Sequence, residues 1–442
     1  MLVSFTLGNW RSFREKATFS MVPTAERRFG WSLPAFPRAP KKLLPIAAIY
    51  GANASGKSNF FKGLAFLAKF VLRGAEVGNT IPVAPYRLDP SYEKNPSFFS
   101  VMFIVNEITY EYTLALTSKE IYNEKLSTYV AGNEKVLFKR EKGNEFYVND
   151  SLEEQERIRF VYQGTQDNFP FLTNAFRQKI SFVQTPYQWF RHKLIFIGSE
   201  SHYGAKDIFI NGSSFQKELG EYLARYDTGI TEIKSEEEDF PNLPDPAYLE
   251  SFRDGEILEA GKERVCIIKN DEDIKIAVLN TVHRDSCGNE VAFNFKEESD
   301  GTKRLLDILP ALLLCNSYPD AGLVFIIDEI DRSMHSNLIY KLITDYISNS
   351  SEKTRFQMIM TTHDLGLMNQ KLLRRDEMWI IDKANNVSNI YSISDFNREL
   401  RFDSALQSIY KNGYLGGIPR VVIPDLPPFK DHVARQDHHH DE

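Results

Sequence analysis

The sequence predicts an α/β fold built on a parallel sheet, with an antiparallel β region and an inserted helical and mixed lobe. Three observations support this fold class. A short apolar strand, a glycine-rich loop and a helix follow one another from Ile46 to about Leu72. A second apolar strand, beginning at Leu323, ends in two carboxylates. From Phe98 to about residue 150, polar and apolar residues alternate, which is typical of antiparallel strands.

The glycine-rich loop, Gly51 to Ser58, has the pattern G-x-x-x-x-G-K-S in the strand–loop–helix setting that a phosphate-binding loop needs. Its glycines let successive N–H groups turn toward one anion, at the positive end of the following helix. Lys57 is expected to reach the β- and γ-phosphates of a nucleotide, and the Ser58 hydroxyl to ligate Mg²⁺. The alternative is a chance glycine-rich turn before a helix.

The apolar strand ending in carboxylates, Leu323 to Glu329, fits the centre of a parallel sheet that is covered on both faces. Asp328 is expected to hold Mg²⁺ together with Ser58, and Glu329 to orient or deprotonate a water molecule. The alternative is a strand that merely ends at a polar surface.

His363 closes another short apolar strand, Phe356 to Met360. A histidine at a strand end beside a phosphate site is placed to sense the γ-phosphate. The alternative for a lone histidine is a structural role.

A serine, a glycine and a threonine, Ser299, Gly301 and Thr302, precede the long apolar helix that leads to the carboxylate strand. A hydroxyl and free N–H groups at a helix start suit an anion. By these residues alone, an ordinary N-cap is the favoured explanation of the pattern.

Composition and charge exclude several classes. At 442 residues the chain is too long for one ordinary core, so two or three lobes are expected. A net charge of −7 argues against wrapping nucleic acid with the whole surface, and a local basic patch is left open. The three scattered cysteines read as reduced thiols. No signal peptide and no apolar run of membrane-spanning length are expected, so the predicted location is the cytoplasm.

The order of predicted elements divides the chain into five parts. A strand from Leu2 to Leu7, a turn, a returning strand, a loop over 22–45 and the glycine-rich loop make up 1–97. The antiparallel β region covers 98–150. An inserted lobe covers 151–296: helices to about 190, an apolar strand over 193–198, a helix over 213–226 and three strands over 264–295. The part with the carboxylates and His363 covers 297–420, and a tail covers 421–442.

Two polar segments are expected to be solvated. Ser235 to Asp239, followed by Pro241, Pro244 and Pro246, predicts an acidic surface loop. The tail ends in His438, His439, His440, Asp441 and Glu442, and for its histidine cluster a disordered segment is favoured over a metal site.

Taken in order, these motifs make the chain resemble ABC-type P-loop ATPase heads of the SMC/RecF kind, and more closely the small bacterial ATPases of abortive infection and phage defence, of the AbiL/RloA kind. Gly51–Ser58 is similar to Walker A, Phe325–Glu329 to Walker B, and Ser299–Thr302 to a degenerate signature motif. Asp331–His335 resembles the D-loop and His363 the switch histidine. The opening VSFTLGNWRSF, Asp227–Ile230 and Tyr414–Pro419 also resemble recurring patterns of these families.

The resemblance implies a head without a long coiled coil that binds ATP and Mg²⁺ and hydrolyses ATP. Two heads are expected to face each other head to tail, with each ATP between Walker A of one chain and Ser299, Gly301 and Thr302 of the other. Lys57, Glu329 and His363 are the implied catalytic residues, and Ser58 and Asp328 the metal ligands. The implied nucleotide contacts of the loop are Asn53, Ala54, Ser55, Gly56, Lys57, Ser58 and Asn59.

One departure concerns the glutamine that follows the Walker A helix in such ATPases, because this chain has no glutamine before Gln155. Relatives in defence imply a separately encoded effector such as a nuclease as partner. Two alternatives stay open: a RecF-like DNA-binding clamp in repair, and a scaffold that binds ATP with little turnover. The intact Glu329 argues against the scaffold.

Overall fold

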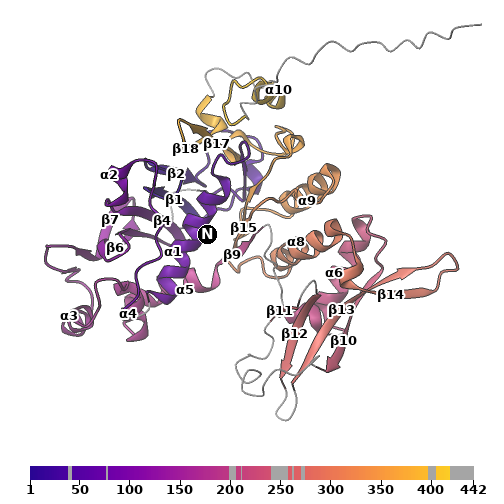
Figure 1. The fold of residues 1–442 in the computed structure, drawn as a ribbon, viewed down its shortest axis with the longest axis horizontal. Coiled ribbons are helices and arrows are strands. Elements are labelled where there is room, and N and C mark those ends of the chain that lie inside the picture. The colour runs from indigo at the N-terminus through magenta and orange to yellow at the C-terminus, as the bar shows by residue number, and fades with distance from the viewer. Residues whose placement is uncertain are drawn as a thin grey trace, which may run out of the picture.

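The structure is a computed structural model that describes residues 1–37, 42–75, 78–198, 206–210, 212–239, 257–260, 263–269, 274–396 and 405–418. The described residues form three sheets (Figure 1). In this part of the chain no helix is both long and apolar enough to cross a bilayer.

The central sheet is mainly parallel, as the sequence predicts, and its strand order is β18-β17-β3-β16-β15-β9. Only β18 runs antiparallel to its neighbour. Its strands are β3 (Ile46–Tyr50), β9 (Leu194–Ile197), β15 (Val324–Ile327), β16 (Gln357–Thr361), β17 (Met378–Ala384) and β18 (Val387–Ser392).

Helices cover both faces of this sheet, and strand β3 shows why its residues are all apolar. Successive strand side chains point to opposite faces. Ala47 and Ile49 join the hydrophobic cluster that contains helix α1 (Lys57–Arg73) and α5 (Gln184–His192). Ile46 and Ala48 join the cluster of α8 (Asp300–Ser317) and α9 (Ser336–Ser348) on the other face. A strand buried on both faces therefore reads as a continuous apolar run.

The second sheet is antiparallel, with the order β2-β1-β4-β5-β6-β7-β8. The N-terminal strands thus continue the β region expected over 98–150. Strands β4 and β5 are joined at Asn106 and Glu107, which both have positive φ, as a two-residue hairpin turn requires. The strands are β1 (Leu2–Gly8), β2 (Ala17–Ser20), β4 (Ser97–Val105), β5 (Ile108–Leu116), β6 (Ile121–Val130), β7 (Asn133–Glu141) and β8 (Tyr147–Val148).

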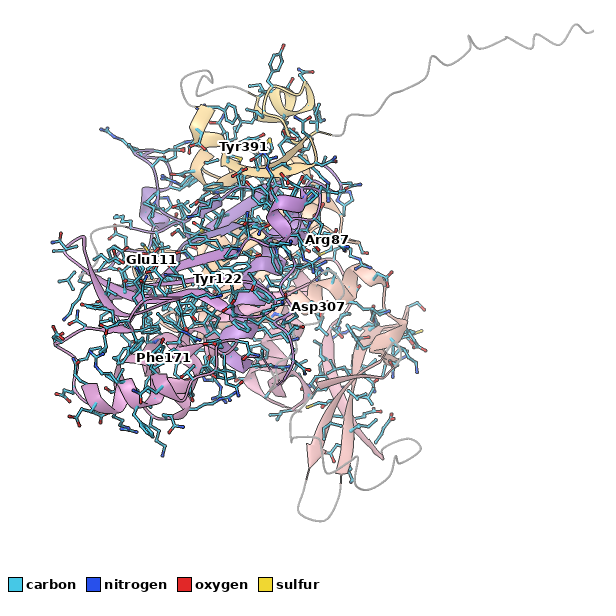
Figure 2. All side chains as sticks on the ribbon, turned by 60° about the vertical axis from the view of Figure 1, so that its left-hand side comes forward. Arg87, Glu111, Tyr122, Phe171, Asp307 and Tyr391 are labelled. Atoms are coloured by element: carbon cyan, nitrogen blue, oxygen red, sulfur yellow. The ribbon has the colours of Figure 1, made fainter. Side chains whose placement is uncertain are left out.

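Helices α3 (Gln155–Gln163) and α4 (Phe171–Arg177) complete this part of the molecule. The fully buried carboxylate of Glu124, on β6, accepts the N–H groups of Phe171 and Leu172 at the start of α4 (Phe171 in Figure 2). Burial raises the pKa of Glu124, and Arg140 on β7 opposes that rise. The helices over 155–192 match the sequence prediction.

The third sheet, of β10 to β14, has the order β10-β13-β12-β11, with β14 paired to β13. Helix α6 (Ser214–Arg225) packs on β10 and on α8, and so joins this sheet to the rest of the molecule (Figure 1). The range 151–296 therefore contributes β9 to the central sheet and β10 to β14 to a separate one. These strands are β10 (Glu232–Asp239), β11 (Ile257–Ala260), β12 (Glu263–Lys269), β13 (Ile274–Arg284) and β14 (Glu290–Asn294).

The acidic loop predicted over Ser235–Asp239 is wrong, because these residues belong to β10 and pair with β13. The buried Ser235 hydroxyl donates to the carbonyl of Phe209. Strand β10 lies at the sheet edge, where exposed charged side chains are common, so the charge run does not mark a loop. Pro241, Pro244, Pro246 and the histidine tail lie outside the described residues.

Two further short helices lie in the described part of the chain. Helix α2 (Pro90–Glu93) begins at Asp89, whose side chain accepts the N–H of Ser91. Helix α10 (Leu406–Lys411) lies at the β17–β18 end of the molecule (Figure 1). There the Tyr391 hydroxyl donates to the carbonyl of Leu415 at 2.7 Å (Tyr391 in Figure 2), and the N–H of Gly417 donates to Asp382.

Candidate nucleotide site

The loop between β3 and α1 has the backbone of an anion cradle. Gly51 and Gly56 have φ of 155° and 118°, and Gly56 is the N-cap of α1. The first N–H groups of a helix have no partners within it, and a glycine cap carries no side chain to occupy them. A Cβ added at Gly56 would lie 2.6 Å from the Ser388 hydroxyl, so only glycine fits. In the same loop the buried Ser55 hydroxyl has no hydrogen-bond partner among the residues that the structure describes. These features fit a phosphate group.

Lys57, the first residue of α1, is folded against this loop. Its ammonium donates to the carbonyls of Gly51 at 2.8 Å and Ala52 at 3.1 Å. Burial lowers the pKa of Lys57 to about 8, against the opposing effect of Asp328 and Glu329. The cation is therefore held next to the cradle, with two carboxylates close enough to influence it.

The carboxylates follow β15 directly, and a threonine from the neighbouring strand fixes their backbone. Thr361 donates its hydroxyl to Asp328 Oδ1 at 2.6 Å and accepts the N–H of Glu329 at 2.7 Å. Glu329 has a φ of 50°, which is uncommon outside glycine and typical of functional positions. The bond from Thr361 uses one Asp328 oxygen and leaves the other for a cation.

His363 lies two residues beyond the end of β16, and its backbone N–H donates to Asp331 Oδ2 at 3.0 Å. Burial and the positive charge of Lys57 lower its pKa, while Asp331 and Glu329 oppose the shift. The imidazole is therefore neutral at neutral pH and can donate one hydrogen bond to an anion.

Strand order explains why these groups lie together. The P-loop follows β3, His363 follows β16 and the carboxylates follow β15, and these three strands are adjacent and parallel. The carboxyl ends of adjacent parallel strands meet at one edge of the sheet, about 5 Å apart. The structure thus brings Lys57, Ser58, Asp328, Glu329 and His363 to one edge.

Ser299 and its neighbours lie at the same edge of the sheet but away from the P-loop. Ser299 caps α8 and accepts the N–H of Thr302 at 3.2 Å, and the two hydroxyls are 2.9 Å apart. A Cβ at Gly301 would lie 2.7 Å from the carbonyl of Ser333, so the helix start touches the segment after the carboxylates. Arg304 binds the carbonyl of Gly198, beyond β9, which places this helix start on the far side of β15 from the P-loop.

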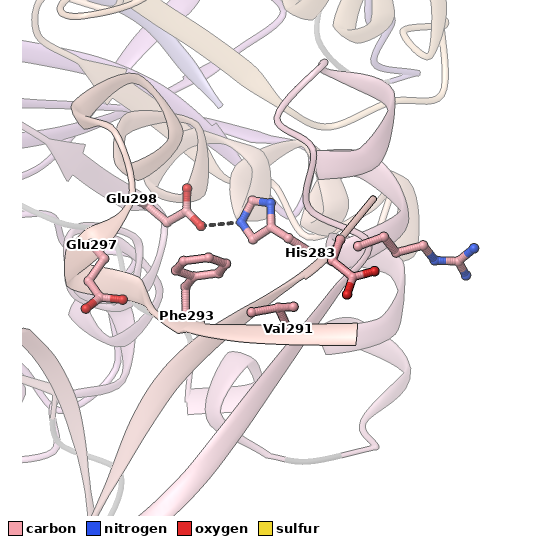
Figure 3. Close-up of a pocket in the computed structure, with 7 residues that line it drawn as sticks. His283, Val291, Phe293, Glu297 and Glu298 are labelled. Carbon is pink, nitrogen blue, oxygen red and sulfur yellow. Dashed lines mark hydrogen bonds and ion pairs between the residues drawn. The ribbon is translucent and has the colours of Figure 1, made fainter. Parts of the chain in front are cut away.

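A pocket of about 410 Å³ lies beside this helix start, on β13 and β14 (Figure 3). Glu298, which precedes Ser299, accepts the hydroxyl of Thr281 at 2.5 Å and lies 2.7 Å from His283 Nε2. The aromatic ring of Phe293 lies between Glu297 and His283 in the same view, and it is 41% exposed. The signature-like segment is therefore continuous with an accessible pocket.

Sequence reasoning missed four residues that brace the site. Ser388 donates to the carbonyl of Ser55 at 2.5 Å, and Ser12 accepts the side-chain amide of Asn59 at 3.0 Å. Thr361 and Arg304 hold the carboxylate segment. Thr361 stood next to a recognised motif and could have been found; the other contacts join positions far apart in the sequence.

These features define the class of protein: an α/β domain with a P-loop of the nucleotide-binding type. The chain belongs to the family described as "AAA domain, putative AbiEii toxin, Type IV TA system", whose model matches residues 46–369. This membership bears out the expected relationship at the level of the family, with an AbiEii-type link.

Solved structures with a similar arrangement include the "SMC head domain from Thermotoga maritima". It is 14% identical, with a TM-score of 0.36, covering 88% of this chain and 98% of that chain. Another is the "SmcHead bound to the C-winged helix domain of ScpA", 12% identical, with a TM-score of 0.38, covering 88% and 97%. No curated protein matches the sequence significantly.

Proposed function

We propose that this protein is a cytoplasmic ATPase whose ATP-bound state assembles two heads, and that it acts as a switch in bacterial anti-phage defence with a separately encoded effector such as a nuclease. The proposal of ATPase activity rests mainly on one observation: the P-loop, the carboxylate pair and His363 lie together at one edge of the sheet. Family membership supports the defence role.

The chemistry is phosphoryl transfer from ATP to water, in which positioning and charge neutralisation do most of the catalysis. The start of α1 and Lys57 bind the β- and γ-phosphates, together with the loop from Asn53 to Asn59. Ser58 and Asp328 would hold Mg²⁺, which is normally bound by few protein ligands and by phosphates. Bound Mg²⁺ supplies neutralisation of phosphate charge.

Two side chains complete the proposed reaction. Glu329 accepts the proton of the attacking water, and its backbone is already fixed at Thr361. Neutral His363 donates to the γ-phosphate. Glu329 thus acts on the attacking water, whereas His363 stabilises the negative charge on the γ-phosphate in the transition state.

Assembly follows from the position of Ser299, Gly301 and Thr302. Their helix start is bonded near β15 and β9, whereas the P-loop follows β3. Two strand spacings, about 10 Å, separate β3 from β15. These anion-binding groups are therefore proposed to contact the nucleotide of a second copy, in a head-to-tail pair.

The test combines mass measurement with phosphate release, with and without ATP and Mg²⁺. Glu329→Gln is expected to lose turnover by about 100-fold or more and to lock into an ATP-dependent dimer. Glu153→Gln, an exposed carboxylate on the surface, serves as the matched control and should behave as wild type. Equal mass in every condition would exclude ATP-driven assembly, and unchanged turnover in Glu329→Gln would exclude its role as base.

A second candidate function is nucleic-acid binding, and one surface favours it. A pocket of about 710 Å³ beside α1 is lined by Arg11, Lys62, Lys69 and Arg73, and none of the described residues that line it is acidic. Lys62 and Arg73 are about 16 Å apart along the helix axis, which suits an extended chain of phosphates better than one mononucleotide.

This candidate is tested by fluorescence anisotropy with single-stranded and duplex 20-mers at two salt concentrations. The double variant Lys69→Glu/Arg73→Glu should lose salt-dependent binding. Lys353→Glu/Lys371→Glu, an exposed pair outside that pocket, is the control for net charge. Equal binding by both double variants would reject this surface.

A further inference from the structure

Arg304 occupies an unusual position for a charged residue. It lies in the second turn of α8 and is 5% exposed. Its guanidinium donates to three backbone carbonyls: Nη1 to Gly198 at 2.9 Å, and Nη2 to Asp328 at 2.7 Å and to Glu329 at 3.2 Å. A buried guanidinium is retained only when its hydrogen bonds offset its desolvation. Here two of the three bonds end on the backbone of the carboxylate pair.

The Glu329 residue is consequently held from both sides. Thr361 accepts its N–H, and Arg304 binds its carbonyl. Its φ of 50° persists only where the surroundings impose it. A displacement of Arg304 would therefore alter the direction in which the Glu329 side chain leaves the backbone.

The same helix start carries the residues proposed to bind a second copy's nucleotide. Ser299 and Thr302 are bonded to each other, and Arg304 follows Thr302 by two positions on the first turns of α8. Gly301 packs against Ser333 with no room for a Cβ. The helix start and the carboxylate backbone therefore form one hydrogen-bonded unit.

We propose that Arg304 is a positioning residue that couples the two nucleotide sites of the assembled pair. This rests on the proposed function, in which Ser299 contacts the partner's nucleotide while Glu329 acts on the nucleotide of its own chain. Binding at one site shifts the start of α8, and Arg304 transmits that shift to Glu329 at the other site. ATP turnover is then cooperative.

The experiment measures turnover against ATP concentration for wild type, Arg304→Gln and Arg304→Lys, together with ATP-dependent mass. Wild type should show a Hill coefficient above 1, toward the limit of about 2 set by two sites. Arg304→Gln should still bind ATP and assemble, with a Hill coefficient near 1 and turnover about tenfold lower. Arg304→Lys keeps the charge and can reach one carbonyl, so it should lie between the two.

The matched control is Arg140→Gln. Arg140 is equally buried and also binds two backbone carbonyls, of Phe169 and Gln166, but it lies in the antiparallel sheet. It should lower the melting temperature without changing the Hill coefficient. If Arg304→Gln does not fold, Arg304→Lys carries the test by the same comparison.

The outcomes separate the two proposals. If wild type neither hydrolyses ATP nor assembles, the proposed function fails. If wild type does both but has a Hill coefficient of 1, or if the Arg304 variants keep wild-type cooperativity and turnover, the coupling is overturned and the function stands. If Arg140→Gln also abolishes cooperativity, the effect is one of general stability and the coupling role of Arg304 is rejected.

Discussion

Lys57 carries the clearest residue-scale consequence, because its pKa of about 8 lies close to neutral pH. In the nucleotide-free protein the ammonium loses its proton as the pH rises through about 8. Bound phosphates favour the charged form, so binding takes up a proton above that pH. ATP should therefore bind about tenfold more weakly at pH 9 than at pH 7.

Titration calorimetry in the Glu329→Gln background, across this pH range, measures the effect. Lys57→Arg is the control, because a guanidinium stays charged throughout and the comparison also cancels the ionisation of the nucleotide itself. The free energy of unfolding changes with pH in the opposite direction to ATP affinity. The nucleotide-free protein should gain stability as the pH rises from about 8 toward 10.5, the ordinary pKa of a lysine, because over this range the unfolded chain binds more protons than the folded one. Parallel pH profiles for wild type and Lys57→Arg would refute the assignment.

Individual side chains were predictable where a local pattern carries the chemistry. The loop from Gly51 to Ser58 and the pair Asp328–Glu329 are contiguous motifs, and the structure places both at one edge of the sheet. Arg304 was not predictable, since its role depends on the backbone conformation of residues about 24 positions away and on the end of β9. The catalytic and binding roles of the Gly51–Ser58 loop and of Asp328 and Glu329 stay predictions.

At the scale of elements, the hairpin of β17 and β18 braces the P-loop from the side opposite β16. The backbone N–H of Ser388 donates to the carbonyl of Ser12, and the Ser388 hydroxyl donates to the carbonyl of Ser55. These two bonds connect the N-terminal turn, the hairpin and the loop. No strands are predicted from the sequence in this part of the chain. Asn385 and Asn386, with φ of 50° and 65°, form the two-residue turn of this hairpin, and their type is a usable signal for it.

Ser388→Ala removes one bond to the loop and should weaken ATP binding about 2- to 10-fold, the range expected for a single hydrogen bond. Ser392→Ala is the control. That serine is buried at the other end of the same hairpin, and its hydroxyl forms a hydrogen bond with the hydroxyl of Ser394 rather than with the loop. Calorimetry on both variants separates bracing of the loop from general hairpin stability. Equal losses of affinity would show that the Ser388 contact has no specific effect.

The strand order was harder to predict than the strands. Apolar runs identified β3, β15 and β16, yet each pairing joins segments that are distant in the chain, and several orders satisfy the same runs. The order β18-β17-β3-β16-β15-β9 was therefore not among the expectations drawn from the sequence. The charge run in β10 led to the wrong prediction of a loop, because an edge strand tolerates charged side chains that also suit a loop.

At the scale of the whole molecule, a head-to-tail pair predicts complementation between two defective chains. Lys57→Ala removes a phosphate contact but leaves Ser299 intact. Ser299→Arg blocks the contact with a second copy but leaves the P-loop intact. A mixed pair then contains one complete site, built from the P-loop of the Ser299→Arg chain and the Ser299 segment of the other.

Neither variant alone should form an ATP-dependent dimer, whereas an equimolar mixture should, when the Ser299→Arg chain also carries Glu329→Gln to prevent turnover. Mass measurement of chains with distinguishable tags identifies the mixed pair. Ser299→Thr, which keeps the hydroxyl that caps α8, is the control for the cap and should assemble by itself. A mixture that stays monomeric, while Ser299→Thr assembles, contradicts a nucleotide shared between chains and favours a complete site within each chain.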